Sequence, residues 1–259
     1  MKSKPVSNSN KKATAKPELW RLNKFIAHAG VCSRRKADEL ISSGKIKVNG
    51  KLIAEPGHKV SLNDEVVYEG KTLCAEKKLY ILLNKPKDYI ATTDDDRGRK
   101  TVIDLIKYKL HPQFATYRLY PVGRLDRKTT GLLLITNDGD LSEKLAHPRS
   151  QVTKTYKIGL ESPLKKIDFH SIAQGIKLED GFIKVDEIAF PDSADHRIIG
   201  IKIHSGKNRI IRRIFEHLGY NVKTLDRVIF ANLTKKDLPR GKWRFLKEKE
   251  IIRLKYLNS

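Results

Sequence analysis

The chain of 259 residues is long enough for one or two domains with a sizeable core, and its 53 Lys and Arg residues outnumber its 30 Asp and Glu residues by 23. Positive charge spread along the whole chain indicates a polyanionic partner, and we favour nucleic acid because no long basic amphipathic helix points to a membrane surface. No run approaches about 18 apolar residues and the first residues lack a hydrophobic signal core, so we expect a cytoplasmic protein with no membrane association. The two cysteines form no Cys-x-x-Cys pair, which fits a reducing compartment and argues against structural zinc.

The N-terminal third changes character at Trp20. Residues 1–18 are polar and basic with almost no large apolar side chain, so we expect a disordered basic tail. Apolar residues then recur at helical spacing, Ser33 is placed to cap a second helix, and Asn49-Gly50 is a strong hairpin signal between two short strands. The pattern predicts a compact module over residues 19–70, followed by a charged linker at 71–78.

The segment RLNKFIAHAGVCSRRKADELISSGKIKVNG, which begins at Arg21, resembles an S4 RNA-binding domain. A basic helix face beside a helix N-terminus suits contact with RNA phosphates. The candidate RNA-binding residues are Arg21, Lys24, Arg34, Arg35, Lys36, Lys45 and Lys47. For any one of these bases, a solvated surface with no ligand is the alternative.

The stretch PVGRLDRKTTGLLLIT at residues 121–136 carries the strongest chemical signal. A short polar segment lies between two glycines, and the apolar run after it is typical of a buried strand. Asp126 lies among Arg124, Arg127 and Lys128, which favour a carboxylate over a neutral acid. Such a carboxylate can act as a nucleophile, although an Asp–Arg pair in a glycine-bounded loop is more often a stabilised turn.

Gly-Arg-Leu-Asp followed by Thr-Gly-Leu-Leu-Leu-Ile-Thr resembles the catalytic motif of pseudouridine synthases, in particular the family that contains ribosomal small-subunit synthase A and large-subunit synthases B, E and F. The resemblance extends from about Arg21 to Leu246, and the late phrase Leu-Pro-Arg-Gly-Lys-Trp is nearest to the large-subunit synthase B branch. It implies that Asp126 is the catalytic carboxylate and that Lys85-Pro86 braces the catalytic loop.

Two later segments match the family's remaining site motifs. In Lys154-Thr155-Tyr156 the resemblance makes Tyr156 the aromatic residue that packs against the target uracil, with Lys154 beside it as a substrate contact. In GKNRIIRRI, a glycine turn that leads into a predicted helix, it places Ile211 under the base and pairs Arg212 with Asp126.

Three other positions follow from the same resemblance. Arg124 and Arg209 are implied substrate contacts, with Arg124 placed to fill the vacated space or to hold the flanking phosphate. The family's usual glutamine is Ile210 in this chain, a loss that we expect to be tolerated.

We therefore expect an α+β protein in which the S4 domain precedes a pseudouridine synthase domain over residues 79–250, built on a mixed, mainly antiparallel sheet, with a C-terminal tail at 251–259. The expected activity is the isomerisation of uridine to pseudouridine in ribosomal RNA, with large-subunit 23S rRNA favoured and 16S rRNA or tRNA left open. Whether Asp126 attacks C1′ or C6 or acts through a glycal is also open. We expect a monomer with no cofactor and no metal, and we interpret the acidic run at 94–96 as a solvated loop.

Two other classes of function compete with this interpretation. A non-catalytic RNA-binding or ribosome-assembly protein would use the S4-like module alone and would tolerate replacement of Asp126. A nucleosidase that releases free uracil is disfavoured, because it would require a water-activating base and the loop around Asp126 offers none.

Overall fold

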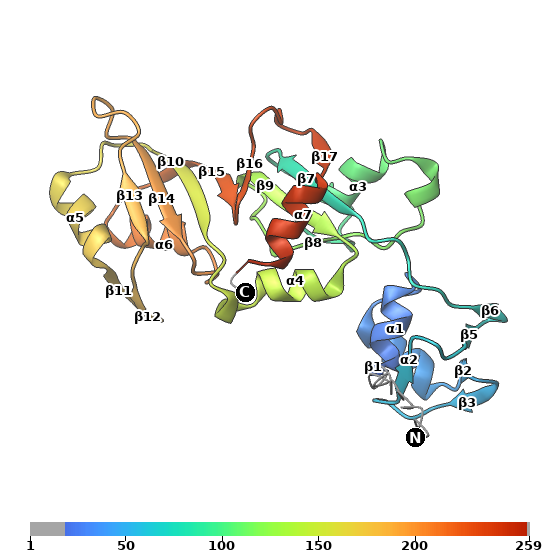
Figure 1. Ribbon diagram of the computed structural model, residues 1–259. Helices are drawn as coiled ribbons and strands as arrows, with labels where there is room; N and C mark the ends of the chain where they lie inside the picture. Colours follow the sequence, from blue (N-terminus) through green and yellow to red (C-terminus); the bar gives the residue numbers. More distant parts are fainter. Residues whose placement is uncertain (1–18, 258–259) are drawn as a thin grey trace, which may run out of the picture. The chain divides into compact units, whose positions relative to one another are not determined.

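The computed structural model describes residues 19–257, so the expected basic tail at 1–18 lies outside the described part of the chain. The chain separates into two compact units, and the division falls between Glu76 and Lys77 (Figure 1).

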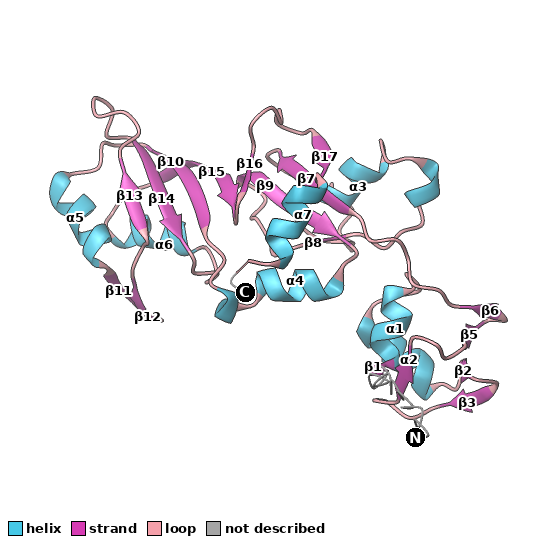
Figure 2. Ribbon diagram, in the orientation of Figure 1, coloured by secondary structure: helices cyan, strands magenta, loops and turns pink. Residues whose placement is uncertain are grey.

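The N-terminal unit combines two helices with short strands (Figure 2). The helices are α1 (Leu22–His28) and α2 (Arg34–Ser42). The strands are β1 (Leu19–Arg21), β2 (Ile46–Val48), β3 (Lys51–Ile53), β4 (Lys59–Ser61), β5 (Val66–Tyr68) and β6 (Lys71–Thr72). β1 pairs with β4, and the others form a sheet in the order β3-β2-β5-β6.

Local sequence signals explain this small unit. The hydroxyl of Ser33 accepts a hydrogen bond from the backbone N–H of Lys36 and so caps α2. Asn49 and Gly50 both adopt positive φ, at 50° and 78°, as the tight turn between β2 and β3 requires. The predicted module is therefore confirmed in its helices and hairpin.

The predicted linker at 71–78 begins too early. β6 pairs with β5 inside this segment, and Leu73 packs against the core of the N-terminal unit. The error arose because the charged composition of the segment hid a two-residue strand, which backbone pairing stabilises regardless of side-chain polarity.

A nine-stranded sheet forms the centre of the C-terminal unit, in the order β13-β14-β10-β15-β9-β7-β17, with β16 paired to β15 and β8 paired to β9. The strands are β7 (Tyr80–Lys85), β8 (Tyr120–Pro121), β9 (Thr130–Thr136), β10 (Lys154–Leu160), β13 (Glu187–Ala189), β14 (Ile198–Ile203), β15 (Val222–Phe230), β16 (Leu233–Thr234) and β17 (Trp243–Phe245). A separate hairpin joins β11 (Ile176–Leu178) to β12 (Gly181–Ile183). The helices are α3 (Val102–Lys107), α4 (Gly139–Ala146), α5 (Lys166–Gln174), α6 (Ile210–His217) and α7 (Glu248–Lys255).

Helices cover both faces of the sheet around β7 and β9, which explains why every residue of these strands is buried (Figure 1). Leu132 and Leu134 of β9 pack in a cluster with residues of α4 and α7, whereas Leu133 and Ile135 pack in a cluster with residues of α3. The uninterrupted apolar run after the loop that carries Asp126 is therefore an interior strand, as its composition predicted.

The pairing of β9 with β15 is parallel, while the other strand pairs of this sheet are antiparallel. Here Thr130 lies opposite Asp226 and Gly131 lies opposite Arg227. Gly131 has φ of 106°, and a Cβ at this position would lie 2.2 Å from the carbonyl oxygen of Arg227. Only glycine permits this approach, so Gly131 allows the two halves of the sheet to join.

The C-terminal tail predicted at 251–259 is wrong where the structure describes it. Residues 248–255 form α7, and Leu254 is completely buried in a cluster with residues of α4 and β9. Glu250 fixes the start of the helix by accepting two hydrogen bonds of 2.7 Å from Arg244 and one of 2.8 Å from the backbone N–H of Lys247. The prediction missed this helix because charged residues dominate the segment and only Leu254 of the helix is buried.

Candidate active site

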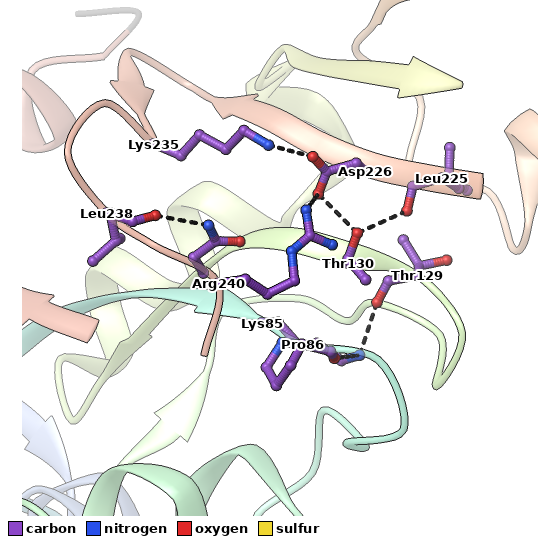
Figure 3. Close-up of polar contacts among 10 residues, drawn as sticks. Lys85, Pro86, Thr129, Thr130, Leu225, Asp226, Lys235, Leu238 and Arg240 are labelled. Carbon is purple, nitrogen blue, oxygen red and sulfur yellow. Dashed lines mark hydrogen bonds and ion pairs between the residues drawn. The ribbon is translucent and has the colours of Figure 1, made fainter. Parts of the chain in front are cut away.

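Lys85, at the end of β7, is fully buried and holds the loop that precedes β9 (Figure 3). Its Nζ donates to the carbonyl oxygens of Pro86, Asp126, Arg127 and Thr129, at 3.1, 3.2, 3.3 and 2.8 Å. Burial lowers the pKa of Lys85 to about 8, although the carboxylate of Asp126 favours the charged form. The expected bracing of the loop around Asp126 by this lysine is therefore confirmed.

The loop before β9 presents Asp126 to solvent. Its carbonyl oxygen accepts a hydrogen bond from the backbone N–H of Thr129, which closes the turn, and its side chain is exposed. Of the flanking bases, Arg127 turns away and pairs with Asp88 at 3.1 Å. The three neighbouring charges therefore do not all gather around the carboxylate.

One pocket of about 180 Å³ brings together residues from five parts of the chain. Its wall is formed by the loop before β9, the end of α4, β10, the loop and first turn of α6, and β15. Six of the predicted site residues lie around it: Arg124, Asp126, Lys154, Tyr156, Arg209 and Ile211. The pocket lies at the parallel junction of β9 and β15, where the two halves of the sheet meet.

Lys154 and Arg209 are held in position by other parts of the C-terminal unit. Nζ of Lys154 donates to the carbonyl oxygen of His204 at 2.7 Å, and burial together with the charge of Arg227 lowers the pKa of Lys154 to about 8. Arg209 has a left-handed backbone at the start of α6 and pairs with Glu216 at 3.0 Å.

Ile210 and Ile211 are both buried at the start of α6 and pack in one apolar cluster. The position where the family uses glutamine is therefore part of the core in this chain.

The predicted ion pair between Arg212 and Asp126 is absent from the described structure. Nη1 of Arg212 donates to the carbonyl oxygen of Val222 at 3.0 Å, and this arginine does not line the pocket. Successive residues of a helix point roughly 100° apart, so a helix that turns Ile211 toward the pocket turns the next side chain toward the start of β15.

Sequence reasoning missed Leu225 and Arg227, which line the same pocket from β15. Both side chains point to one face of the strand, since alternate residues share a face. The available signal was an arginine at an inward position of β15, whose sequence is VKTLDRVIF.

On the opposite face of β15, Asp226 ties three elements together (Figure 3). It accepts hydrogen bonds from Thr130 at 2.8 Å and Arg240 at 3.1 Å and forms an ion pair with Lys235. Hydrogen bonds from these partners lower the pKa of Asp226 despite its partial burial. Asp226 thus anchors the segment after β16 and the start of β9 to β15.

A wider hollow of about 650 Å³ adjoins the pocket and shares Arg124, Asp126 and Arg209 with it. Its far side is the acidic loop, where Asp95 pairs with Arg99 at 2.5 Å and this pairing lowers the pKa of Asp95 to about 2. Within residues 19–257, no group of three His, Cys, Asp or Glu side chains could hold a metal ion.

The bases predicted to bind RNA lie mainly on the surface of the N-terminal unit. Lys24 is partly buried with its ammonium 4.6 Å from the centre of the Trp20 ring, and Lys36 pairs with Glu39 at 2.6 Å. The exposed bases are Arg21, Arg34, Arg35, Lys36, Lys45 and Lys47.

None of the helices in the described part of the chain is long and apolar enough to span a membrane.

Comparison with known families agrees with this division of the chain. The model of the RNA pseudouridylate synthase family matches residues 79–217, and that of the S4 domain matches residues 20–66. The chain therefore belongs to the RNA pseudouridylate synthase family and carries an S4 domain ahead of its catalytic domain. The α+β fold with a mixed sheet is as the sequence predicted.

Individual relatives resemble the chain over most of its length. Ribosomal large subunit pseudouridine synthase B of Bacillus subtilis is 42% identical, and the match covers 92% of this chain and 97% of the relative. Dual-specificity RNA pseudouridine synthase RluF of Escherichia coli is 32% identical over 90% of this chain and 78% of its own length. A crystal structure of a pseudouridylate synthase matches with a TM-score of 0.64 at 29% identity, covering 90% of this chain and 99% of its own.

Proposed function

We propose that this chain isomerises uridine to pseudouridine in large-subunit ribosomal RNA, with Asp126 as the catalytic carboxylate. The observation that carries the proposal is that Asp126, Tyr156 and Ile211 surround one pocket although they come from separate parts of the chain. The pocket therefore offers a carboxylate beside an aromatic and an aliphatic surface.

The reaction exchanges one bond of the uracil for another. The N1–C1′ bond breaks, the uracil rotates, and C5 bonds to C1′, while the proton leaves C5 and N1 gains one. Asp126 can form a bond to C1′, add to C6, or remove a proton on the route to a glycal. In each route its carboxylate acts from the ionised form, as nucleophile or base.

The other pocket residues hold the ring while it turns. Tyr156 and Ile211 pack against the base and exclude water from the intermediate. The target nucleotide must leave its helical stack to enter such a pocket. Arg124, at the border of the pocket and the wider hollow, fills the vacated space or binds the flanking phosphate, and Lys154 and Arg209 add positive charge to the wall.

The N-terminal unit supplies further affinity for RNA. Its exposed bases favour phosphates irrespective of sequence. We assign the substrate to the large subunit because the Bacillus subtilis relative, which matches 97% of its own length, is named for that subunit. Cytoplasmic location and action as a monomer belong to the same proposal.

Replacing Asp126 with Asn tests the catalytic assignment. The variant should form no pseudouridine and should retain RNA affinity, because the amide keeps the shape of the side chain but cannot act as nucleophile or base. Asp192→Asn, at an exposed position, is the matched control and should behave as wild type. Pseudouridine formation by the Asp126→Asn variant would refute the assignment and favour a purely RNA-binding protein.

Mass-spectrometric mapping of pseudouridine in RNA from a deletion strain tests the substrate. We expect a single class of site to lose modification in 23S rRNA and to regain it on complementation. Loss of pseudouridine from 16S rRNA or tRNA alone would contradict the proposed substrate RNA without contradicting the proposed reaction.

A further inference from the structure

Arg227 is a buried arginine in the wall of the pocket that the predicted mechanism does not use. Its side chain is 3% exposed, its Nε donates to the carbonyl oxygen of Leu132 at 2.7 Å, and its guanidinium lies 4.8 Å from the centre of the Phe230 ring. These contacts fix the orientation of the guanidinium. Its Nη2, however, is buried and has no hydrogen-bond partner among the described residues.

Within residues 19–257, this guanidinium forms no ion pair with a carboxylate. The adjacent Asp226 points to the other face of β15, where it forms ion pairs with Lys235 and Arg240. A buried charge and an unpaired donor are both costly, and such groups persist in native proteins chiefly where a ligand or reaction uses them. The charge also acts on the pocket, since Arg227 contributes to the lowered pKa of Lys154.

The position of Arg227 suits contact with the edge of a uracil. It lies opposite Tyr156 in the pairing of β15 with β10, and directly opposite residues of an antiparallel pair present neighbouring side chains on one face. Asp126 reaches the same pocket from the catalytic loop. A uracil ring packed on Tyr156 would therefore have the carboxylate of Asp126 near its sugar and the guanidinium of Arg227 in the wall of the same pocket.

Starting from the proposed function, we propose that Arg227 is a catalytic residue whose guanidinium donates a hydrogen bond to a carbonyl oxygen of the target uracil. When the C1′–N1 bond breaks, its electron pair stays on the uracil and is shared by O2 and O4; addition of a carboxylate at C6 likewise moves charge onto O4. A fixed donor in a site shielded from water stabilises such developing charge strongly. The inference thus holds for each of the routes open to Asp126.

The test combines Arg227→Gln with substrates altered at one atom. Single-turnover rates are measured for full-length wild type and variant on RNA that carries uridine, 2-thiouridine or 4-thiouridine at the target position. With uridine we expect the variant to be about 10²–10³-fold slower, with RNA affinity and Tm close to wild type. Arg253→Gln, an exposed arginine of α7, is the control and should match wild type.

The decisive readout is the coupling between the residue and the oxygen. If the guanidinium binds one carbonyl oxygen, replacing that oxygen with sulfur should slow wild type at least tenfold more than it slows Arg227→Gln. Replacing the other oxygen should slow both proteins equally. Additive effects at both oxygens, with the protein folded, would overturn the inference, because a merely structural arginine lowers all three rates equally.

A second variant guards against misfolding. Arg227→Lys keeps the charge with less change in volume, and the same coupling is expected in weaker form; its absence would count equally against the inference. If wild type itself forms no pseudouridine, the proposed function fails, whereas an active wild type without coupling defeats only the role of Arg227.

Discussion

Replacement of Lys85 with Met should impair catalysis beyond what the loss of folded protein explains. The four carbonyl oxygens that Lys85 binds include those of Asp126 and Thr129, so this one side chain sets the path of the catalytic loop. Folding lowers the pKa of Lys85 from 10.5 to about 8. At about 1.4 kcal/mol per pH unit, keeping the ammonium charged at neutral pH therefore costs roughly 3 kcal/mol.

Methionine removes this cost but leaves the loop carbonyls without their donor, and hydrogen bonds to a charged group are each worth about 1.5–3 kcal/mol. An ammonium has three N–H groups, so the lost hydrogen bonds outweigh the removed cost, and we expect the free energy of unfolding to fall by about 2–6 kcal/mol. The rate of the molecules that stay folded should also fall about 100-fold, because a displacement of about 1 Å in a catalytic group has this effect.

The assay is pseudouridine formation under single-turnover conditions, with urea unfolding and RNA binding measured in parallel. Lys87→Met, an exposed neighbour, is the control. An unaltered rate for Lys85→Met would refute the bracing argument, and a rate loss that simply followed the loss of folded protein would refute the additional effect on catalysis.

The same lysine predicts a pH dependence. Wild-type activity should fall as pH rises through about 8, because the neutral amine has fewer donors for the carbonyls of the loop. The contribution of this group to stability has the opposite sign: between pH 8 and 10.5 the unfolded chain binds more protons, so this contribution increases with pH. Unfolding through this group therefore cannot explain the loss, and a flat pH profile would contradict the prediction.

Three further outcomes follow from the structure. Gly131→Ala should lower the free energy of unfolding, measured in urea, by at least about 3 kcal/mol, because the new Cβ would meet the backbone of β15. At Gly123 a Cβ would meet nothing within 4 Å, so Gly123→Ala should lower it by only about 1–2 kcal/mol, for the positive φ alone. Asp226→Asn should lower the free energy of unfolding at pH 7 by about 2–3 kcal/mol. Because the pKa of Asp226 in the folded chain lies below 3.8, the difference between variant and wild type should be complete above about pH 5 and should shrink as the pH falls below 3.8. Thermal unfolding of both proteins at pH 7 and pH 3 measures this difference. The double change Arg34→Gln and Arg35→Gln should weaken RNA binding and reduce the salt slope of log Kd by about 2, and an unchanged slope would exclude these two bases from phosphate contact.

Local signals sufficed for much of the fold. Ser33 with its cap, the Asn49-Gly50 turn and the apolar run at 132–135 each depend on neighbours within a few residues, and each is found where the sequence predicted it. The segment from Lys71 and the helix from Glu248 were misjudged because their charged residues dominate the composition, while their order depends on pairing with β5 and on burial of an apolar side chain.

The sequence by itself pointed to Asp126, Tyr156 and Ile211 as candidate site residues, because the motifs around them are continuous in the chain. Only the tertiary structure decided that Arg227, and not Arg212, lies with them at the pocket. A helix turns its side chains by a fixed angle, which sends Arg212 to the carbonyl of Val222, whereas the parallel pairing of β9 with β15 brings Arg227 beside the catalytic loop. That pairing joins segments about a hundred residues apart through an approach that a glycine permits, and no local pattern reveals such a contact.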